Sequence, residues 1–192
     1  MLRNRRVLWA GFGICLLSLA LVRSLSAQAP KTAAVSVKIL NWEESLEIVK
    51  KNKGKIVVMD VWSTSCDPCM KEFPNLVKLH QAHGKDVACI SVSTDYAGSK
   101  NKPPEYYRER VLKFLQEQEA GFDNVLLNVP SDELFEKIEL SSIPAVYVFG
   151  RDGKLVKRFD SESAENLKTN EEAFTYADVN KVVQGLLKAK KK

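Results

Sequence analysis

The sequence predicts an α/β fold in which a mixed, mainly parallel sheet is flanked by helices. Strand-like and helix-like segments alternate along most of the chain, an order typical of parallel sheets covered by helices on both faces. The segments 55–62 and 86–93 are nearly continuous apolar runs, which is the pattern of central strands buried on both faces. The last two strands, 143–150 and 154–160, are joined by Gly-Arg-Asp-Gly, which predicts a closing β-hairpin at an antiparallel edge.

The other elements follow from periodicity and from start and stop signals. Strands are expected at 35–40, 55–62, 86–93, 124–129, 143–150 and 154–160. Helices are expected at 41–54, 67–84, 104–121, 131–140 and 174–190. The first helix begins at the N-cap Asn41, with Glu44 three residues later as in a capping box, and Gly54 is read as its stop. Gly121 is read as the end of the third helix and Ser131 as the cap of the fourth.

The charge of the chain is concentrated at its N-terminus. The 192 residues suffice for one ordinary domain, and their net charge is +5. Four of the 29 basic side chains and none of the 24 acidic ones lie in the first 29 residues, which leaves 25 basic against 24 acidic in the rest. A nearly neutral body argues against nucleic acid as a partner. The short basic tail, 189–192, is read as a solvated end.

Residues 1–29 are interpreted as a signal peptide or an N-terminal membrane anchor, followed by a linker at 30–34. A basic start precedes the charge-free apolar run 7–22, and Ala-Gln-Ala then stands before Pro30, an order that fits an export signal. The run is short for a membrane span of about 20 residues, so cleavage is favoured and an uncleaved anchor is the alternative. In both cases the body, 35–188, is expected outside the cytoplasm, in the periplasm or its equivalent.

The stretch WSTSCDPCMKEFP contains Cys66 and Cys69, separated by two residues. A disulfide this close in sequence closes too short a loop to be an effective structural staple. A structural zinc site needs about four ligands. The further candidates His80, His83 and Cys89 lie far down a helix or within a buried strand, so neither a metal nor another cofactor is expected.

A redox pair fits this position better, because the cysteines follow a buried strand and open a helix. Unpaired N–H groups and partial positive charge at a helix N-terminus stabilise a thiolate, and Pro68 suits the first helical turn. Cys66 is expected to be exposed and to attack a substrate disulfide, and the shielded Cys69 to resolve the mixed disulfide. Asp67 has two open interpretations. It disfavours the thiolate and makes the pair more reducing, or it is a solvated acid that suits the helix dipole.

The same stretch resembles the active-site segment of the thioredoxin superfamily, and more narrowly that of the TlpA/ResA-like exported thiol–disulfide oxidoreductases. The shared pattern is a tryptophan, a spacer, C-x-P-C, and then Glu and Pro. It is matched here by Trp62, Cys66, Pro68, Cys69, Glu72 and Pro74. A second motif, an Ile/Val-Pro before a strand, is matched by Ile143 and Pro144. The resemblance covers 35–188 and implies a thioredoxin-like fold with a helix–strand insertion. Ser65 departs from it, since the family often has Trp there.

Two acids are candidates for proton transfer, Asp60 through the resemblance and Glu72 through its position three residues after Cys69. Asp60 stands inside an apolar run, so it should be buried with a raised pKa, and it occupies the place of the superfamily's buried acid, which relays a proton to the second cysteine. The alternative is a strand-end acid that meets solvent. Glu72 either tunes the pair or relays protons, or it forms a surface pair with Lys71 or Lys78, which contributes little.

The resemblance also implies a surface that contacts the substrate. Pro144 is expected to be cis, which leaves the backbone of Ile143 free to pair with an extended substrate strand. Asp67 and Pro68 flank the attacking sulfur, and Trp62 is expected to serve both the core and the contact surface. The third cysteine of the body, in the strand 86–93, is read as an inert apolar thiol.

The function predicted in this way is exported thiol–disulfide exchange, with reduction of protein disulfides, including those of apo-cytochrome c, as the activity that the family implies. Because exported compartments are oxidising, a membrane thiol electron donor is expected as a partner. Two alternatives stay open. A peroxiredoxin-like peroxidase would have Thr where this chain has Ser63. The other alternative is a non-catalytic binding or metallochaperone module.

Overall fold

The computed structural model describes residues 34–160 and 174–189, all of which belong to one unit, 32–192. The predicted signal or anchor at 1–29 lies outside the described residues, as do nearly all of the linker at 30–34 and the last three residues of the tail. Among the helices that the structure describes, none has the length and apolar character needed to cross a membrane.

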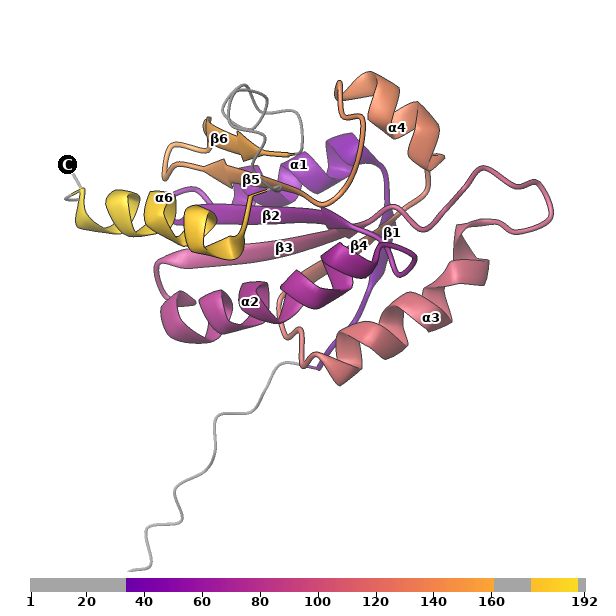
Figure 1. Ribbon diagram of the computed structural model, residues 1–192, viewed down its shortest axis with the longest axis horizontal. Helices are drawn as coiled ribbons and strands as arrows, with labels where there is room; N and C mark the ends of the chain where they lie inside the picture. The colour runs from indigo at the N-terminus through magenta and orange to yellow at the C-terminus, as the bar shows by residue number, and fades with distance from the viewer. Residues whose placement is uncertain (1–33, 161–173, 190–192) are drawn as a thin grey trace, which may run out of the picture. The chain divides into compact units, whose positions relative to one another are not determined.

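Six strands form one mixed sheet (Figure 1). They are β1 (Lys38–Leu40), β2 (Ile56–Trp62), β3 (Val87–Ser93), β4 (Asp123–Leu127), β5 (Ala145–Phe149) and β6 (Leu155–Phe159). The order across the sheet is β1-β4-β3-β2-β5-β6. The contacts of β1 with β4, β4 with β3 and β3 with β2 are parallel, whereas β5 runs antiparallel to both β2 and β6. The predicted mainly parallel sheet with a closing hairpin is confirmed.

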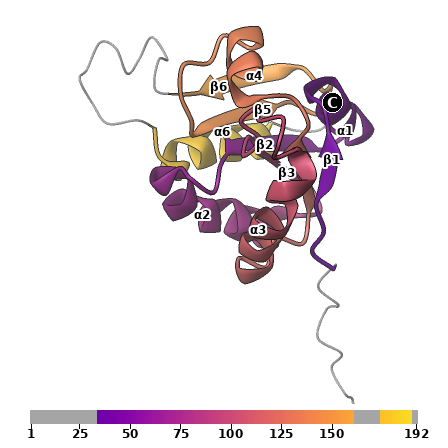
Figure 2. The ribbon, with the colours of Figure 1, turned by 90° about the vertical axis from the view of Figure 1, so that its right-hand side faces the viewer.

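Helices cover both faces of the sheet (Figures 1 and 2). They are α1 (Trp42–Lys51), α2 (Asp67–His83), α3 (Pro104–Glu117), α4 (Ser131–Lys137) and α6 (Tyr176–Lys188). One core cluster joins α2, α3 and α6 to alternate residues of β2, including Val58, while the other joins α1 and α4 to the intervening ones, including Met59. Because both faces are covered, every residue of β2 is buried.

The unit made of α3 and β4 occupies the place of the predicted helix–strand insertion. Its strand lies between β1 and β3, since Val125 is opposite Lys38 on one side and Val92 on the other. An ion pair of 2.8 Å between Lys38 and Asp123 joins the starts of β1 and β4. The insertion thereby widens the sheet on the side of β3 and places α3 beside α2 on the same face.

The first helix has the predicted N-terminus but a different end. Asn41 Oδ1 accepts the backbone N–H of Glu44 at 2.8 Å, and Glu44 Oε2 accepts that of Asn41 at 2.7 Å. The C-cap is Asn52 rather than Gly54. The Asn52 side chain donates to the carbonyl of Ile48 at 2.9 Å, which satisfies one of the open carbonyls of the helix end. Gly54, with φ 93°, serves the following turn into β2 instead.

Two further boundaries differ from the prediction for local reasons. α3 ends at Glu117, before Gly121, because Glu119 takes up the left-handed conformation (φ 55°) that glycine was expected to supply. The N-cap of α4 is Pro130, and Ser131 is the first helical residue without a side-chain cap. The first change shortens α3, the second moves the N-cap of α4 back by one residue, and both leave the topology as predicted.

Candidate active site

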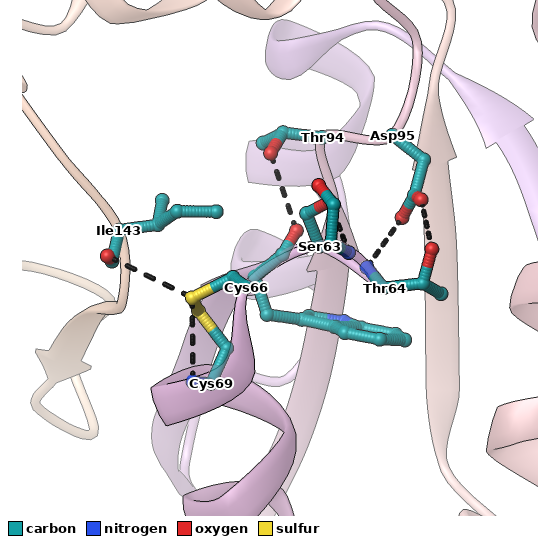
Figure 3. The surroundings of a disulfide bond; sticks show 9 residues. Ser63, Thr64, Cys66, Cys69, Thr94, Asp95 and Ile143 are labelled. Carbon is teal, nitrogen blue, oxygen red and sulfur yellow. Dashed lines mark hydrogen bonds between the residues drawn. A yellow bond between two sulfur atoms is a disulfide. The ribbon is translucent and has the colours of Figure 1, made fainter.

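The two cysteines form a disulfide at the N-terminus of α2 (Figure 3). Their sulfur atoms lie 2.03 Å apart and their Cα atoms 5.2 Å apart. Cys66 is the N-cap residue, and its Sγ accepts the backbone N–H of Cys69 at 3.3 Å. Since a hydrogen-bond donor and the helix dipole both point at this sulfur, the arrangement favours negative charge on Cys66 after reduction.

The two sulfurs differ in their access to solvent. Cys66 is half-buried, whereas Cys69 is 2% exposed and belongs to the core beneath α2. Asp67 and Pro68, in the first helical turn between them, are exposed. A partner can therefore reach Cys66 but not Cys69, which is the asymmetry that attack and resolution require.

The segment before β5 lies against the sulfur of Cys66. The Ile143–Pro144 peptide bond is cis, as predicted. The carbonyl oxygen of Ile143 lies 3.8 Å from Cys66 Sγ (Figure 3), and both Ile143 and Pro144 are half-buried. The two motifs of the sequence, 77 residues apart, thus meet at one sulfur atom.

Asp60 lies inside β2 and is 3% exposed, so the alternative reading as a strand-end acid that meets solvent is wrong. Its side chain points to the face that α2 and α6 cover, where the hydroxyl of Tyr176 donates to Oδ2 at 2.6 Å. The other oxygen, Oδ1, has no hydrogen-bond partner among the described residues. Burial raises the pKa of Asp60 to about 7; the bond from Tyr176 acts in the opposite direction, and the charge of Glu72 raises the pKa further.

Glu72 contacts the last helix instead of a neighbouring lysine. Its Oε2 accepts the backbone N–H of Tyr176 at 3.4 Å and the side-chain amide of Asn75 at 3.1 Å. Within 34–160 and 174–189 no ion pair joins it to Lys71 or Lys78. In place of the alternative surface pair with a lysine, Glu72 contacts the N-terminus of α6, where a carboxylate also suits the helix dipole.

Trp62 is a core residue, which corrects its expected share in the contact surface. It is 0% exposed, and its ring packs against Phe73 and Phe114, each with a centroid distance of 4.9 Å. The side chain follows the alternation of β2 onto the face covered by α2 and α3. A fully enclosed ring supports the loop beneath the cysteines and has no surface to offer a substrate.

A buried carboxylate that the sequence did not reveal holds the loop before Cys66 (Figure 3). Asp95, just beyond β3, accepts the backbone N–H of Thr64 at 3.0 Å and also the Thr64 hydroxyl. It further accepts the Ser93 hydroxyl at 2.7 Å and forms an ion pair of 2.6 Å with Arg110 on α3. The carboxylate is 0% exposed, so these donors compensate its burial. The insertion is thereby connected to the active-site loop.

The remaining candidates for metal binding lie apart. Cys89 is buried, its Sγ donates to the carbonyl of Leu76 at 3.7 Å, and burial raises the pKa of its thiol far above the ordinary value. His83 contacts Gln184 at 3.1 Å, and burial lowers the pKa of His80. In the described part of the chain, no three His, Cys, Asp or Glu side chains gather in a way that could hold a metal ion.

Comparison with known families agrees with this geometry. A family profile described as thioredoxin-like matches residues 54–155, more than half of the chain. The chain belongs to the thioredoxin-like family. The matched region runs from the turn before β2 to the start of β6 and includes both the Cys-x-x-Cys and the cis-proline.

Two curated relatives of this thioredoxin-like protein are named as thiol-disulfide oxidoreductases. The sporulation thiol-disulfide oxidoreductase A of Bacillus subtilis is 25% identical over 74% of this chain and 82% of its own length. The thiol-disulfide oxidoreductase ResA of the same organism is 25% identical over 60% of this chain, which spans only 58% of that relative. The predicted class of enzyme, a thioredoxin-like thiol–disulfide oxidoreductase, is confirmed at this level.

A solved structure supports the fold. The crystal structure of a thiol-disulfide isomerase from Corynebacterium glutamicum is 17% identical and matches with a TM-score of 0.56 over 73% of this chain and 86% of its own. At that identity the match concerns the fold alone, and it confirms the thioredoxin-like architecture.

Proposed function

We propose that this thioredoxin-like protein is an exported reductase of protein disulfides. The observation that supports this most is the pairing of a half-buried Cys66, which accepts a helix N–H, with a buried Cys69 in one disulfide. In the reduced protein, the Cys66 thiolate attacks one sulfur of a substrate disulfide. A mixed disulfide forms, and the other substrate sulfur leaves as a thiolate.

Resolution completes the transfer of two electrons. The thiol of Cys69 gives its proton to the carboxylate of Asp60 and attacks Cys66 Sγ. The bond between Cys66 and the substrate breaks, and the second substrate sulfur leaves as a thiolate that takes up a proton. The substrate is thereby reduced to a dithiol, and the protein is oxidised to the Cys66–Cys69 disulfide. Asp60 suits this role because burial gives it a pKa of about 7, and Glu72 is the second candidate for it.

The substrate is proposed to bind around Cys66 as an extended peptide. Asp67 and Pro68, which follow Cys66 in the chain, are exposed. The backbone of Ile143, before the cis Pro144, lies against the Cys66 sulfur. An extended segment placed there would bring a disulfide within reach of Cys66 and would pair through its main chain with Ile143.

Export and reduction together require a source of electrons. The N-terminal order of basic residues, apolar run and Ala-Gln-Ala supports export, and an oxidising compartment would keep the pair oxidised. A membrane thiol carrier is therefore proposed as the donor, with protein disulfides such as those of apo-cytochrome c as the acceptors.

Turnover of a protein disulfide tests this function. The purified protein should speed the reduction of insulin by dithiothreitol; Cys66→Ser should abolish the effect, and Cys69→Ser should accumulate a mixed disulfide that mass spectrometry detects. Peroxide consumption without disulfide reduction would favour a peroxidase instead. No turnover and no difference between the wild type and Cys66→Ser would leave a binding module.

A further inference from the structure

Tyr176 donates a hydrogen bond to each of the two acids proposed for proton transfer. Its hydroxyl donates to Asp60 Oδ2 at 2.6 Å, and its backbone N–H donates to Glu72 Oε2 at 3.4 Å. Tyr176 is 3% exposed and is the first residue of α6. The first residue of α6, the last helix described, therefore binds both Asp60 and Glu72.

The placement of this hydroxyl is fixed by how α6 begins. Thr175 and Asp178 form a capping box, in which Asp178 Oδ2 accepts the N–H of Thr175 at 3.2 Å and its hydroxyl at 3.0 Å. One turn and two turns further on, Val179 and Val183 are 0% exposed and belong to the same core cluster as Cys69. The helix is therefore held at its start and along its apolar face, and the phenol ring enters the core beneath α2.

Few other groups around Asp60 could donate a hydrogen bond to its carboxylate. Three titratable side chains interact electrostatically with Asp60: Tyr176 from α6, Glu72 from α2 and Cys89 from β3. Glu72 is an acceptor, and the Cys89 thiol donates to Leu76. Asp60 Oδ1 has no partner within the described residues, so the Tyr176 hydroxyl supplies its hydrogen bond.

We propose that Tyr176 is a positioning residue for the resolution step: its hydroxyl orients the Asp60 carboxylate and favours the ionised form that accepts the Cys69 proton. The inference rests on the proposed function. It adds a residue that acts through its hydrogen bond to Asp60 rather than on a sulfur atom. The physical reason is that a hydrogen bond donated to a carboxylate stabilises its charged form.

The direction of the effect follows from that reason. Tyr176→Phe keeps the ring and removes the donor, so Asp60 holds its proton to a higher pH. A hydrogen bond to a charged group corresponds to roughly one pKa unit. The pH midpoint of resolution should rise by about one unit, and resolution below both midpoints should slow about tenfold.

Stopped-flow mixing of the reduced protein with 5,5′-dithiobis(2-nitrobenzoate) separates the two steps. The first release of the coloured thiolate reports attack by Cys66, and the second reports resolution by Cys69. Cys89 is buried and stays silent in the folded protein. Tyr147→Phe is the matched control, because it removes a phenol hydroxyl on the opposite face of the sheet. Only Tyr176→Phe should move the midpoint of the second release, and neither variant should change the first.

The double variant identifies the route of the effect. In an Asp60→Asn background, Tyr176→Phe should leave the pH profile of the second release unmoved. A shift that persists there, or a shift of equal size in Tyr147→Phe, overturns the inference, as does a Tyr176→Phe profile that coincides with the wild type. A wild-type protein that gives no second release refutes the proposed function itself.

A measurement on the unaltered protein remains decisive if Tyr176→Phe does not fold. The carboxyl carbon of Asp60 and the ring Cζ of Tyr176 should titrate by NMR with one shared midpoint, because a single hydrogen bond joins them. A Tyr176 signal that is flat across the Asp60 midpoint contradicts the inference.

Discussion

The hydroxyl of Tyr176 donates a hydrogen bond of 2.6 Å to Asp60 Oδ2, across 116 positions of sequence. The acid lies in the central strand beneath the redox pair, and its donor comes from the last helix. Burial raises the pKa of Asp60 and this bond acts against the rise. Together the two opposing effects give Asp60 a pKa near neutral pH. Such a pKa suits the proposed role, in which the group both accepts and releases a proton.

The burial of Asp60 predicts a specific dependence of stability on pH. Its pKa rises from 3.8 to about 7 on folding, so the folded state binds the proton more tightly than the unfolded state between these values. Stability from this group is therefore lost as the pH rises from about 4 to about 7, by an amount on the order of 4 kcal/mol. The asparagine of Asp60→Asn stays uncharged at every pH. The unfolding free energy of the variant minus that of the wild type should therefore be larger at pH 8 than at pH 5.

Urea unfolding of the oxidised proteins at the two pH values measures that difference. The other carboxylates are common to both proteins and cancel in the comparison. An advantage that is the same at pH 5 and pH 8 would mean that Asp60 does not titrate in this range.

Glu72→Gln distinguishes the two roles that remain for Glu72. The amide oxygen of glutamine still accepts the N–H of Tyr176, but the charge that raises the pKa of Asp60 is gone. The pH midpoint of resolution should therefore fall by a fraction of a unit, opposite in sign to the shift expected for Tyr176→Phe. Stopped-flow release of the second thiolate measures it. A large loss of resolution at every pH would instead make Glu72 the group that moves the proton.

Removal of the Asp95 carboxylate should lower the stability of the protein more than removal of the Arg110 guanidinium that pairs with it. Asp95→Ala leaves the donors of Thr64, Ser93 and Arg110 without their acceptor, at a cost of roughly 2–4 kcal/mol in unfolding free energy. Arg110 is 55% exposed, so Arg110→Ala should cost less, about 1 kcal/mol. Because Asp95 holds the loop before Cys66, Asp95→Ala should also slow the first thiolate release.

Denaturant unfolding and the stopped-flow assay on the same two variants test this ranking. Equal costs in unfolding free energy for both variants would contradict the ranking. An unchanged rate of attack in a folded Asp95→Ala protein would show that Asp95 does not position the loop.

The three cysteines of the body should react with iodoacetamide in the order of their exposure. In the disulfide form Cys66 is half-buried, while Cys69 and Cys89 are 2% and 3% exposed, and the reduced protein is expected to keep this order. Mass spectrometry of peptides after short exposure should find the label on Cys66, and the other two should react only after unfolding. Fast labelling of Cys89 in the folded protein would contradict its burial and its raised thiol pKa.

The parts of the fold that were predictable are those that local patterns encode. The apolar run 55–62 identified the central strand, and the Asn41–Glu44 pair identified the capping box. The Cys-x-x-Cys at a strand–helix junction identified the redox centre. The helix ends were less predictable, because Asn52 and Glu119 perform the tasks that glycines were expected to perform.

The parts of the site that were missed depend on tertiary contacts. Glu72 has lysines nearby in sequence, but its carboxylate binds the start of α6, 104 positions away. Tyr176 was not singled out from the sequence, because no local pattern in the last helix shows that its hydroxyl lies against Asp60. Asp95 lies between the strand expected at 86–93 and the helix expected at 104–121, so no local pattern marked it. Its partners come from the loop before Cys66, from β3 and from α3.

The reduction potential of the Cys66–Cys69 pair, measured by equilibration in dithiothreitol buffers, tests most directly whether the protein is a reductase. A reductase predicts a reversible two-electron couple at or below the value of thioredoxin, about −270 mV, with Asp67→Asn raising the potential if that acid disfavours the thiolate. A value well above this, near the −120 mV or so of a strong disulfide oxidant, would reverse the proposed direction of electron flow. The absence of any reversible couple would mean that the Cys66–Cys69 pair has no redox function.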